Sequence, residues 1–449
     1  GWGRHESADA PVSLALFVGD APGAVFAGPP WIEDPPGKSA ILEGLVDDLV
    51  LFVGLAIRAS PADPWTPSGP VLRVRTGAPI YVDPAAPSGG DGTTPATALN
   101  DLALGILTSY FAYGGGNVWV KGGQVLNSSL PLYGGVYLSG GFDDSMSLDL
   151  RDPAQHVTRI TGSLSQSIFD LRAGNGTCVL DGFDLDGLTL STNGVQDLGQ
   201  PAELRSLSIE NCERGIKLRS LLTGPSVAVL VTGALVQASV LEGLSSDGPF
   251  DCTIEMSTFR LNGREGTKFE SLYAPEFGSA SVHVRGASFD RNGDEGMEIR
   301  LQAPPGSGVG GGRFEIGVLD CDFVLDGLAG LVVNIDYESF PQWSSGIAVR
   351  GCVARANQGP GVDLHLDSTS TCIVERLSSS ANKGEGLLVT SVTLPVMATV
   401  CGSAFVANRG AGVRVLTGQA GVLMSGCVVS GNLGGGVLGA VVPPVAISS

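Results

Sequence analysis

The sequence predicts an all-β protein in which a small β-sandwich precedes a long right-handed parallel β-helix. The first observation is an Asn-x-x-x-Gly step that recurs about every 24 to 34 residues, as expected for stacked structural repeats. The second is that phenylalanines and small residues recur at constant distances before the Asn. The third is composition, because 66 glycines without a collagen period, together with 43% apolar residues, indicate a turn-rich folded chain.

The Asn-x-x-x-Gly step locates the turns of the predicted coils. Successive Asn positions differ by 51, 30, 34, 31, 25, 26 and 24 residues, so one coil in the first interval lacks the step. An Asn column can form hydrogen bonds along its own ladder and accept a left-handed backbone, and Gly permits the next bend. The predicted corner ladder, with its one Asp, consists of Asn211, Asn262, Asn292, Asp326, Asn357, Asn382, Asn408 and Asn432.

Two further columns share one face of the strand before the corner, because offsets of three and five residues both fit the two-residue period of a strand. Adjacent coils lie about 4.8 Å apart, so a column of aromatic rings becomes an internal stack, each ring contributing roughly 1.5–3 kcal/mol. No helical periodicity of useful length separates the strands, so leucine-rich and ankyrin-type solenoids fit poorly. The predicted stack is Phe259, Phe289, Phe323 and Phe405, and the small column includes Ser257, Ala287, Cys321 and Cys352.

Residues 80–440 carry motifs that go beyond the repeat. The segments Ile80-Tyr81-Val82-Asp83-Pro84 and Gly90-Asp91-Gly92-Thr93 open this region. They resemble the start of secreted bacterial members of the pectin-lyase-like right-handed parallel β-helix superfamily. The resemblance implies a short helix that caps the end of the β-helix, and residues 99–110 have the apolar spacing for it.

Residues 1–79 are interpreted as a separate domain. Their short apolar runs lie between Pro- and Gly-rich turns, and residues 42–59 resemble the E-to-F region of a fibronectin type III domain. Trp2 would then be the core tryptophan of strand B, and the sandwich would lack its first strand. The apolar tail at 441–449 could fill that open edge in a neighbouring subunit, which would give a head-to-tail filament. The alternative is a chain that begins late and has a disordered tail.

The resemblance implies outer-face carboxylates in the enzymes of the superfamily, but their signatures are not intact here. None of the four histidines (His5, His156, His283 and His365) lies in the Gly-His-Gly motif of polygalacturonase-like members. Pectate-lyase-like members bind calcium, which takes six to eight oxygen ligands. A solvated acidic face on a chain of net charge −19 accounts for the acidic groups better than a partial calcium shell does, so we assign no catalytic residue and no metal ligand. The groups are Asp320, Asp322 and Asp326; Asp363 and Asp367 beside His365; and Asp290, Asp294, Glu295 and Glu298 with Arg291 and Arg300.

The eight cysteines include no Cys-x-x-Cys, so a zinc site is poorly supported. Cys321 and Cys352 have the same offset on consecutive coils, which places their Cα atoms within disulfide range. A disulfide between them is therefore possible. The alternative is a column of free buried thiols that serve as small apolar fillers.

Charge and hydropathy exclude two classes of partner. The net charge of −19 and the pI of about 4.5 argue against nucleic acid and anionic membranes. No apolar run approaches the roughly 18 residues that a membrane-spanning helix needs. We expect a secreted or cell-surface protein with a structural or adhesive role, a homo-oligomer or filament joined by strand exchange. The alternative is a polysaccharide lyase or glycoside hydrolase acting on acidic glycans, with calcium as the one cofactor considered.

Overall fold

The computed structural model divides the chain into two compact units, Gly1–Pro79 and Ile80–Ser449. In the first unit it describes residues 13–19, 32–33, 50–58, 64, 66–67, 72–75 and 79. In the second unit it describes residues 80–439 and 446–448 except for 127–128, 164, 175, 189–190, 220–225, 249, 271–278, 303–312, 337–343, 367–369, 392–395 and 417–419.

The first unit contains one antiparallel sheet with the strand order β2-β1-β3-β4, and β5 also pairs with β3. A sandwich requires two packed sheets, whereas the described residues of this unit form one. The fibronectin type III resemblance therefore stays a prediction, and Trp2 lies outside the described residues. The strands are β1 (Ser13–Gly19), β2 (Ile32–Glu33), β3 (Val50–Arg58), β4 (Thr66–Pro67) and β5 (Leu72–Arg75).

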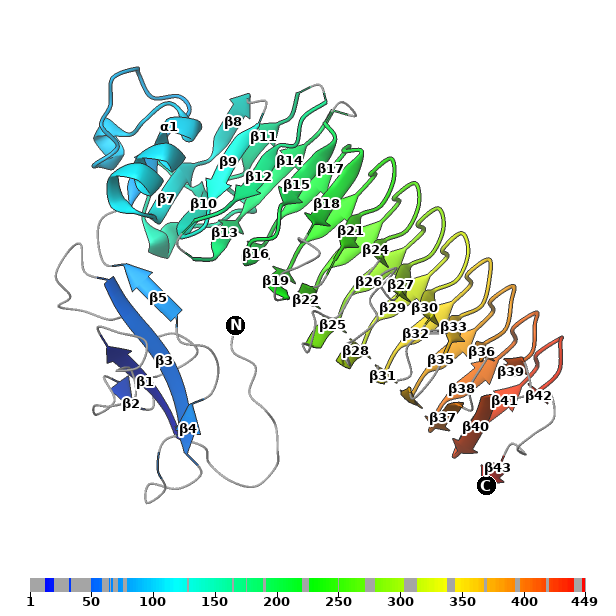
Figure 1. Ribbon diagram of the computed structural model, residues 1–449. Coiled ribbons are helices and arrows are strands. Elements are labelled where there is room, and N and C mark those ends of the chain that lie inside the picture. The colour runs from blue at the N-terminus through cyan, green and yellow to red at the C-terminus, as the bar shows by residue number, and fades with distance from the viewer. Residues whose placement is uncertain are drawn as a thin grey trace. The chain divides into compact units, whose positions relative to one another are not determined.

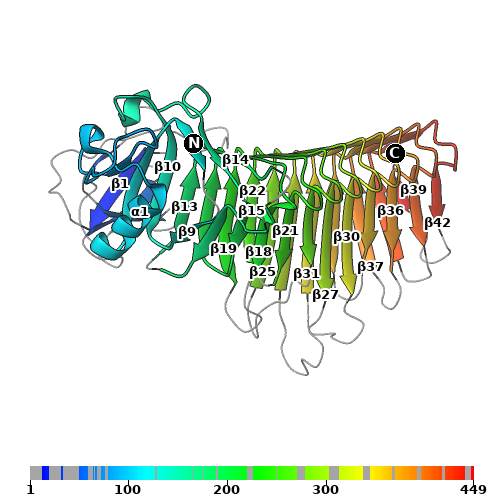
Figure 2. The ribbon, with the colours of Figure 1, turned by 90° about the horizontal axis from the view of Figure 1, so that it is seen from above.

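The second unit is a parallel β-helix, which confirms the predicted fold class. Its described strands form three all-parallel sheets, and the chain visits sheets 1, 2 and 3 in turn before it starts the next coil. Figures 1 and 2 show the strands of successive coils side by side along the solenoid. Each residue pairs with its equivalent one coil away, as in the series Thr258, Ser288 and Asp322. Positions that repeat in the sequence therefore become columns in space.

The three sheets are made of short strands. Sheet 1 contains β6 (Ile80–Val82), β7 (Gly116–Lys121), β10 (Val136–Phe142), β13 (Cys178–Asp181), β16 (Ala202–Arg205), β19 (Val227–Thr232), β22 (Phe250–Glu255), β25 (Ser279–Arg285), β28 (Arg313–Leu319), β31 (Ser344–Arg350), β34 (Thr371–Glu375), β37 (Val396–Cys401), β40 (Ala420–Ser425) and β43 (Ala446–Ser448). Sheet 2 contains β8 (Gly123–Leu126), β11 (Thr158–Thr161), β14 (Phe183–Asp186), β17 (Ser208–Glu210), β20 (Leu235–Gln237), β23 (Thr258–Arg260), β26 (Ser288–Asp290), β29 (Asp322–Val324), β32 (Val353–Arg355), β35 (Ser378–Ser380), β38 (Ala404–Val406) and β41 (Val428–Ser430). Sheet 3 contains β9 (Leu130–Tyr133), β12 (Phe169–Arg172), β15 (Asn193–Asp197), β18 (Arg214–Arg219), β21 (Leu244–Asp247), β24 (Thr267–Glu270), β27 (Met297–Gln302), β30 (Leu331–Asp336), β33 (Val362–His365), β36 (Leu387–Thr390), β39 (Val413–Leu416) and β42 (Val437–Gly439).

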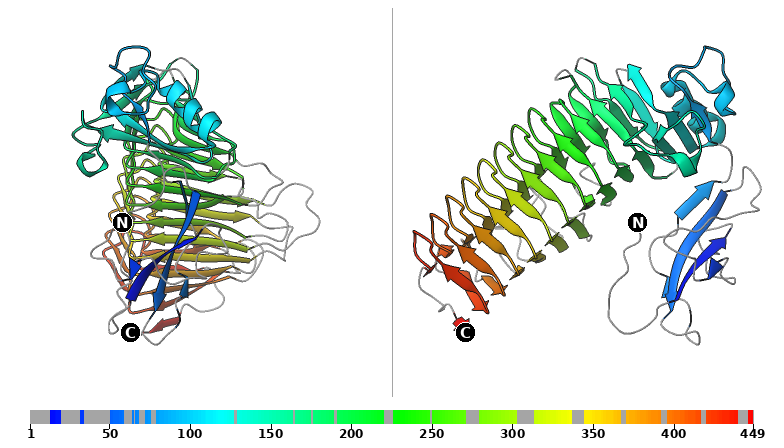
Figure 3. Two further views of the ribbon diagram at one scale, coloured as in Figure 1. Left: turned by 90° about the vertical axis from the view of Figure 1, so that its left-hand side faces the viewer. Right: turned by 180° about the vertical axis from the view of Figure 1, so that it is seen from behind.

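Helical segments lie near the N-terminal end of the β-helix, which α1 covers (Figures 1 and 3). Asp101 is the N-cap of α1, and its carboxylate accepts a hydrogen bond from Leu104 N at 3.1 Å. A Cβ on Gly105 would come within 2.7 Å of Val82, so glycine lets the helix approach the first strand. Among the described residues, no helix is long and apolar enough to cross a membrane. The segments are η2 (Pro95–Thr97), α1 (Leu102–Leu107), η3 (Thr108–Ala112) and η4 (Leu148–Leu150).

The corner between sheets 2 and 3 is lined by a ladder of amide side chains with one Asp, which is buried up to Asn408 and half-buried at Asn432. The backbone N–H of each member except the last donates to Oδ1 of the member one coil further on, with distances of 2.9 to 3.3 Å. We expected the Asn itself to adopt the left-handed conformation. The residue before it does so instead, as Leu261 and Arg291 show with φ of 54°. The ladder members are Asn262, Asn292, Asp326, Asn357, Asn382, Asn408 and Asn432.

Asn211 is not a member of this ladder, contrary to the prediction. The register from Glu210 through Gln237 to Arg260 aligns Asn211 with the left-handed position, and its own φ is 56°. Its side chain donates to Asp186 Oδ1 at 3.1 Å. The turn from Asn211 to Gly215 is one residue shorter than the equivalent turn from Leu261 to Gly266, so the same Asn-to-Gly spacing produces a different register.

The phenylalanine column is continuous over three coils. The ring centroids of Phe259, Phe289 and Phe323 follow at 5.5 and 4.9 Å, and the rings are almost parallel. Phe405 is fully buried but does not belong to this stack. Ala354 and Ser379 occupy the column on the two intervening coils, so no ring reaches it from that side.

The disulfide considered between Cys321 and Cys352 is not formed, and all eight cysteines are free thiols. Both are fully buried in the small column. Cys321 Sγ donates to Leu319 O at 3.2 Å, and Cys352 Sγ donates to Val318 O and Arg350 O at 3.4 Å. Backbone carbonyls therefore satisfy the thiols, which fill space in the core as the alternative predicted.

The described end of the tail belongs to the chain's own β-helix. β43 pairs in parallel with β40, with Ala446 opposite Leu423 and Ile447 opposite Met424. We expected the tail to complete the sandwich of a neighbouring subunit. Within this chain the same residues extend sheet 1, so this pairing lends no support to strand exchange.

Candidate functional site

Three glutamates form a column on the outside of the turn that enters sheet 3. Gly243 N donates to Glu265 O, and Gly266 N donates to Glu295 O, so Glu242, Glu265 and Glu295 lie on consecutive coils. Each directly precedes the glycine of its turn. Like charges at this spacing repel one another and are desolvated by burial, so such a column needs nearby cations.

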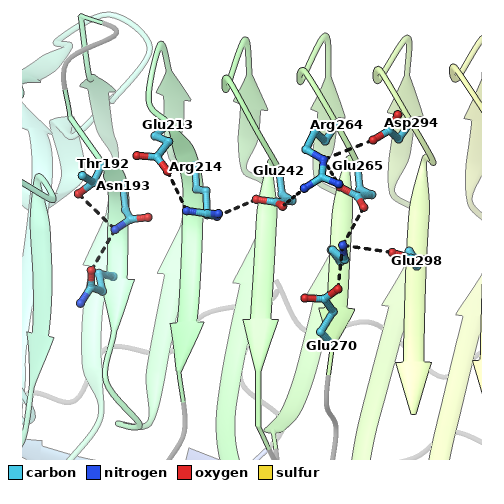
Figure 4. Close-up of polar contacts among 12 residues, drawn as sticks. Thr192, Asn193, Glu213, Arg214, Glu242, Arg264, Glu265, Glu270, Asp294 and Glu298 are labelled. Carbon is cyan, nitrogen blue, oxygen red and sulfur yellow. Dashed lines mark hydrogen bonds and ion pairs between the residues drawn. The ribbon is translucent and has the colours of Figure 1, made fainter. Parts of the chain in front are cut away.

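Two arginines supply part of that compensation (Figure 4). Arg214 donates from Nε to Glu242 Oε2 at 2.7 Å. Arg264, which is half exposed, lies 3.6 Å from Glu242 and pairs with Asp294 at 3.4 Å. The paired side chains thus alternate in charge along the solenoid axis, in the order Arg214, Glu242, Arg264 and Asp294. Glu242 and Glu265 themselves are buried.

Lys268 on β24 is the centre of the arrangement. Its side chain is only 8% exposed, and Nζ lies 2.8 Å from Glu270, 3.1 Å from Glu265 and 3.6 Å from Glu298. Burial alone would lower its pKa, but the hydrogen bonds to Glu270 and Glu265 outweigh burial and raise the pKa of Lys268. Lys268 is therefore a permanent buried cation at neutral pH.

Glu298 on β27 is the outward neighbour of Lys268 in the sheet register. It is buried, and its Oε1 accepts a 2.5 Å hydrogen bond from Arg300 Nε. Burial raises the pKa of Glu298, and Arg300 and Lys268 oppose this shift. We call this group the Lys268 cluster and define it as Arg214, Glu242, Arg264, Glu265, Lys268, Glu270, Asp294, Glu295, Glu298 and Arg300.

Glu295 differs from the other carboxyl groups because no basic side chain is paired with it in the part of the chain that the structure describes. Burial, and then the charge of Glu298, raise the pKa of Glu295 to about 7. Glu295 is thus partly protonated near neutral pH, whereas Arg300 and Lys268 oppose the rise in the pKa of Glu298. A proton donor beside ionised carboxylates is the arrangement that general acid–base catalysis requires.

Oxygen atoms of Glu265, Asp294 and Glu295 also lie within 4.8 Å of one another. This spacing could supply three ligands to a divalent cation, but calcium takes six to eight. Lys268 and Arg264 already contact two of the three carboxylates. The donor set therefore fits a calcium site poorly.

The other acidic groups considered for calcium do not come together. Asp322 is exposed on sheet 2, while Asp326 is fully buried in the corner ladder. Asp320 lies in the turn before β29 and has a left-handed φ of 53°. These three side chains therefore occupy different surroundings despite their proximity in sequence, and Asp367 lies outside the described residues.

Asp363 and His365 lie on the outer face of sheet 3, further along the solenoid. His365 Nε2 is 3.7 Å from Asp363 Oδ1. Burial raises the pKa of Asp363, and His365 opposes the shift. In the outward column, Val332 separates Asp363 from Glu298, so this pair is distinct from the Lys268 cluster.

The sequence interpretation singled out Asp294, Glu295, Glu298 and Arg300 but missed the rest of the cluster. Glu242, Glu265 and Glu295 all directly precede the turn glycine, so alignment on that glycine would have revealed the column. Lys268 carries no such signal. Its contact to Glu298 depends on the register between β24 and β27, whereas Glu265 lies three residues before it on the same coil.

Comparisons with known proteins bear on the fold. No protein-family model and no curated protein sequence matches the chain. The A-module of mannuronan C-5 epimerase AlgE6 from Azotobacter vinelandii is 14% identical, with a TM-score of 0.52, covering 76% of this chain and 95% of that one. The catalytic unit of a thermostable GH87 α-1,3-glucanase from Streptomyces thermodiastaticus (13% identity, TM-score 0.38) covers 98% of this chain and 85% of its own. A family 28 exopolygalacturonase from Yersinia enterocolitica (13% identity, TM-score 0.33) covers 90% and 85%.

At these identities the likeness concerns the fold alone. The epimerase module and the three parallel sheets agree on one architecture. The second unit, from Ile80 onward, has a right-handed parallel β-helix fold.

Proposed function

We propose that this protein is an extracellular enzyme that cleaves acidic polysaccharides on the outer face of sheet 3, with the Lys268 cluster as its acid–base centre. The observation that carries the proposal is Glu295, a half-buried carboxyl group with a pKa of about 7 beside Glu265 and Asp294. A general acid is most effective when its pKa lies near the working pH. Glu295 can then protonate the leaving glycosidic oxygen, a step common to hydrolysis and β-elimination.

The rim of the cluster supports an acidic substrate. Arg264 and Arg300 are 46% and 42% exposed, and guanidinium groups bind carboxylates with two parallel hydrogen bonds. Their contacts to Asp294 and Glu270 are long, at 3.4 and 4.0 Å. A uronate carboxylate could therefore compete with Asp294 and Glu270 for these arginines, while Lys268 stays paired with Glu265 and Glu298.

A structural neighbour with a TM-score above 0.5 is consistent with this substrate class. Its name describes an epimerase of mannuronan, a uronic-acid polymer. A filament or adhesive role, our first expectation from the sequence, has no comparable support. The described tail residues 446–448 pair within their own chain.

The test is an activity screen of the full chain on polygalacturonate, alginate and a neutral glucan. New reducing ends without unsaturated products indicate hydrolysis, and unsaturated products indicate elimination. Glu295→Gln should reduce kcat by roughly 10²- to 10⁴-fold, as expected for loss of a general acid. Glu375→Gln is the matched control, because Glu375 pairs with Arg350 at 3.3 Å on sheet 1. Unchanged kcat in Glu295→Gln, or cleavage of the neutral glucan alone, would contradict the proposal.

A further inference from the structure

The corner ladder contains one acid among amides. Asp326 is fully buried, and its Oδ1 accepts hydrogen bonds from Asn292 N at 3.1 Å and Asn292 Nδ2 at 3.0 Å. In this respect it replaces the amide oxygen of an Asn exactly where the ladder needs an acceptor. Its second oxygen, Oδ2, has no hydrogen-bond partner among the described residues.

Asp326 Oδ2 occupies the place where the other members put their amide nitrogen. A Cβ built on Gly296 would lie 2.6 Å from Asp326 Oδ2. The same construction on Gly266 meets Asn292 Nδ2 at 2.9 Å, and on Gly330 it meets Asn357 Nδ2 at 2.8 Å. The one unpartnered oxygen therefore stands at a donor position of the ladder.

The surroundings of that position offer acceptors and negative charge. In equivalent members Nδ2 donates to the next Oδ1, as from Asn382 to Asn408 at 2.9 Å. It also donates to the carbonyl three residues before the preceding ladder member, as from Asn292 to Phe259 O at 3.2 Å. For Asp326 the corresponding acceptors are Asn357 Oδ1 and the carbonyl of Phe289. If Asp326 were ionised, its Oδ2 and these two oxygen atoms would all be hydrogen-bond acceptors, and no proton would lie between them.

We propose that Asp326 is a positioning residue that stands in the ladder as a neutral carboxylic acid. It donates a hydrogen bond from Oδ2 to Asn357 Oδ1. This bond fixes the carboxyl group, whose Oδ1 accepts the two hydrogen bonds from Asn292, and so holds the turn at 292–295, which carries Glu295. The positioning role rests on the proposed function of Glu295, whereas the protonated state of Asp326 does not.

Electrostatics agrees with the geometry. Burial, followed by weaker effects of the charges of Asp290 and Glu295, raises the pKa of Asp326 to about 8, although the hydrogen bonds from Asn292 oppose the shift. Asp290 lies on β26 and Glu295 on the turn before β27, and both are acidic. Asp326 takes part in none of the ion pairs that the structure describes.

The sign of the pH dependence follows from this raised pKa. An unfolded Asp titrates near pH 4, at about 3.9. Between that pH and about 8 the unfolded state has released the proton while the folded state keeps it, so stability falls as pH rises. The contribution is complete below pH 4, is lost by about pH 8, and changes no further above it.

The experiment compares the full chain with Asp326→Asn in denaturant titrations from pH 4 to pH 9. The amide supplies the donor at every pH, so the unfolding constant of wild type relative to Asp326→Asn should rise by up to tenfold per pH unit and level off near pH 8. Asp322→Asn is the control, because Asp322 is exposed on the same coil. Parallel pH curves for wild type and Asp326→Asn would overturn the protonated state, whatever the activity of the enzyme.

Hydrogen exchange tests the positioning role. At pH 9 the amides of residues 293–296 should be protected more strongly in Asp326→Asn than in wild type, after correction for intrinsic exchange rates. The turn at 383–386 has Asn382 in its ladder and serves as the internal reference. An equal gain of protection in both turns would show a general stabilisation and would overturn the positioning role, independently of any result with Glu295→Gln.

Discussion

Two columns of polar side chains run along the same turns of this β-helix, and the stacked side chains find their hydrogen-bond and charge partners in different ways. The corner ladder that contains Asn262 and Asn292 is buried, and three positions later the column of Glu265 and Glu295 follows on the outside. An amide carries a donor and an acceptor, so identical neighbours satisfy one another. A carboxylate offers acceptors only, so the outer column depends on Arg264, Lys268 and the proton of Glu295. The first column stabilises the fold by repetition, whereas the second requires specific partners, as a chemical site does.

The largest expected effect comes from removing the central cation of the outer column. Lys268→Met leaves Glu265 and Glu298 buried without their shared partner, which should cost about 3–5 kcal/mol of unfolding free energy at pH 8. The loss should shrink toward pH 5, because burial raises the pKa of Glu298, which can then take up a proton. Denaturant titrations at both pH values measure it. Lys217→Met, at the equivalent position two coils earlier, is the control. An equal loss of unfolding free energy in both variants would show that the outer column does not depend on Lys268 in particular.

Breaking the inner ladder should have the next largest effect. Asn292→Ala deletes the donors to Phe259 O and Asp326 Oδ1 and the acceptor for Asn262. Buried groups left without partners should cost about 3 kcal/mol in total, with little dependence on pH below about 7, where Asp326 keeps its proton. Thermal unfolding compared with Asn334→Ala, a half-buried residue on the outer side of β30, checks this value. A strongly pH-dependent loss would mean that the inner column is not neutral.

The smallest effect is expected in the aromatic column beside the ladder. Phe289→Leu removes a ring stacked on both sides, whereas Phe405→Leu removes a ring without a partner in the stack. The first substitution should therefore cost about 1 kcal/mol more than the second, which corresponds to the stacking contribution beyond burial. Paired denaturation curves measure the difference. Equal losses would show that burial alone stabilises both rings.

Sequence reasoning worked best where one residue type repeats on every coil. The columns of Asn and Phe, and the coil without the step, follow from intervals in the chain, and β19, β20 and β21 form that coil. Asn211 and Phe405 were assigned wrongly for local reasons. A turn shortened by one residue shifts Asn211 out of the ladder, and Ala354 and Ser379 interrupt the column before Phe405.

The candidate site could be predicted only in part. Asp294, Glu295, Glu298 and Arg300 were visible as a charged group, but the same composition describes an ordinary solvated surface. The contacts of Lys268 to three carboxylates arise from two neighbouring coils and decide that this group is buried and paired.

The sequence by itself determined the β-helix, because stacking turns each periodic position into a column whose side chains must suit one another. It also determined that the corner ladder consists of neutral amides, except at Asp326. Only the tertiary structure decided the state of the charges. The pKa of Glu295 and of Asp326 depends on desolvation and on atoms from the adjacent coils, and these distances are set by register rather than by residue type.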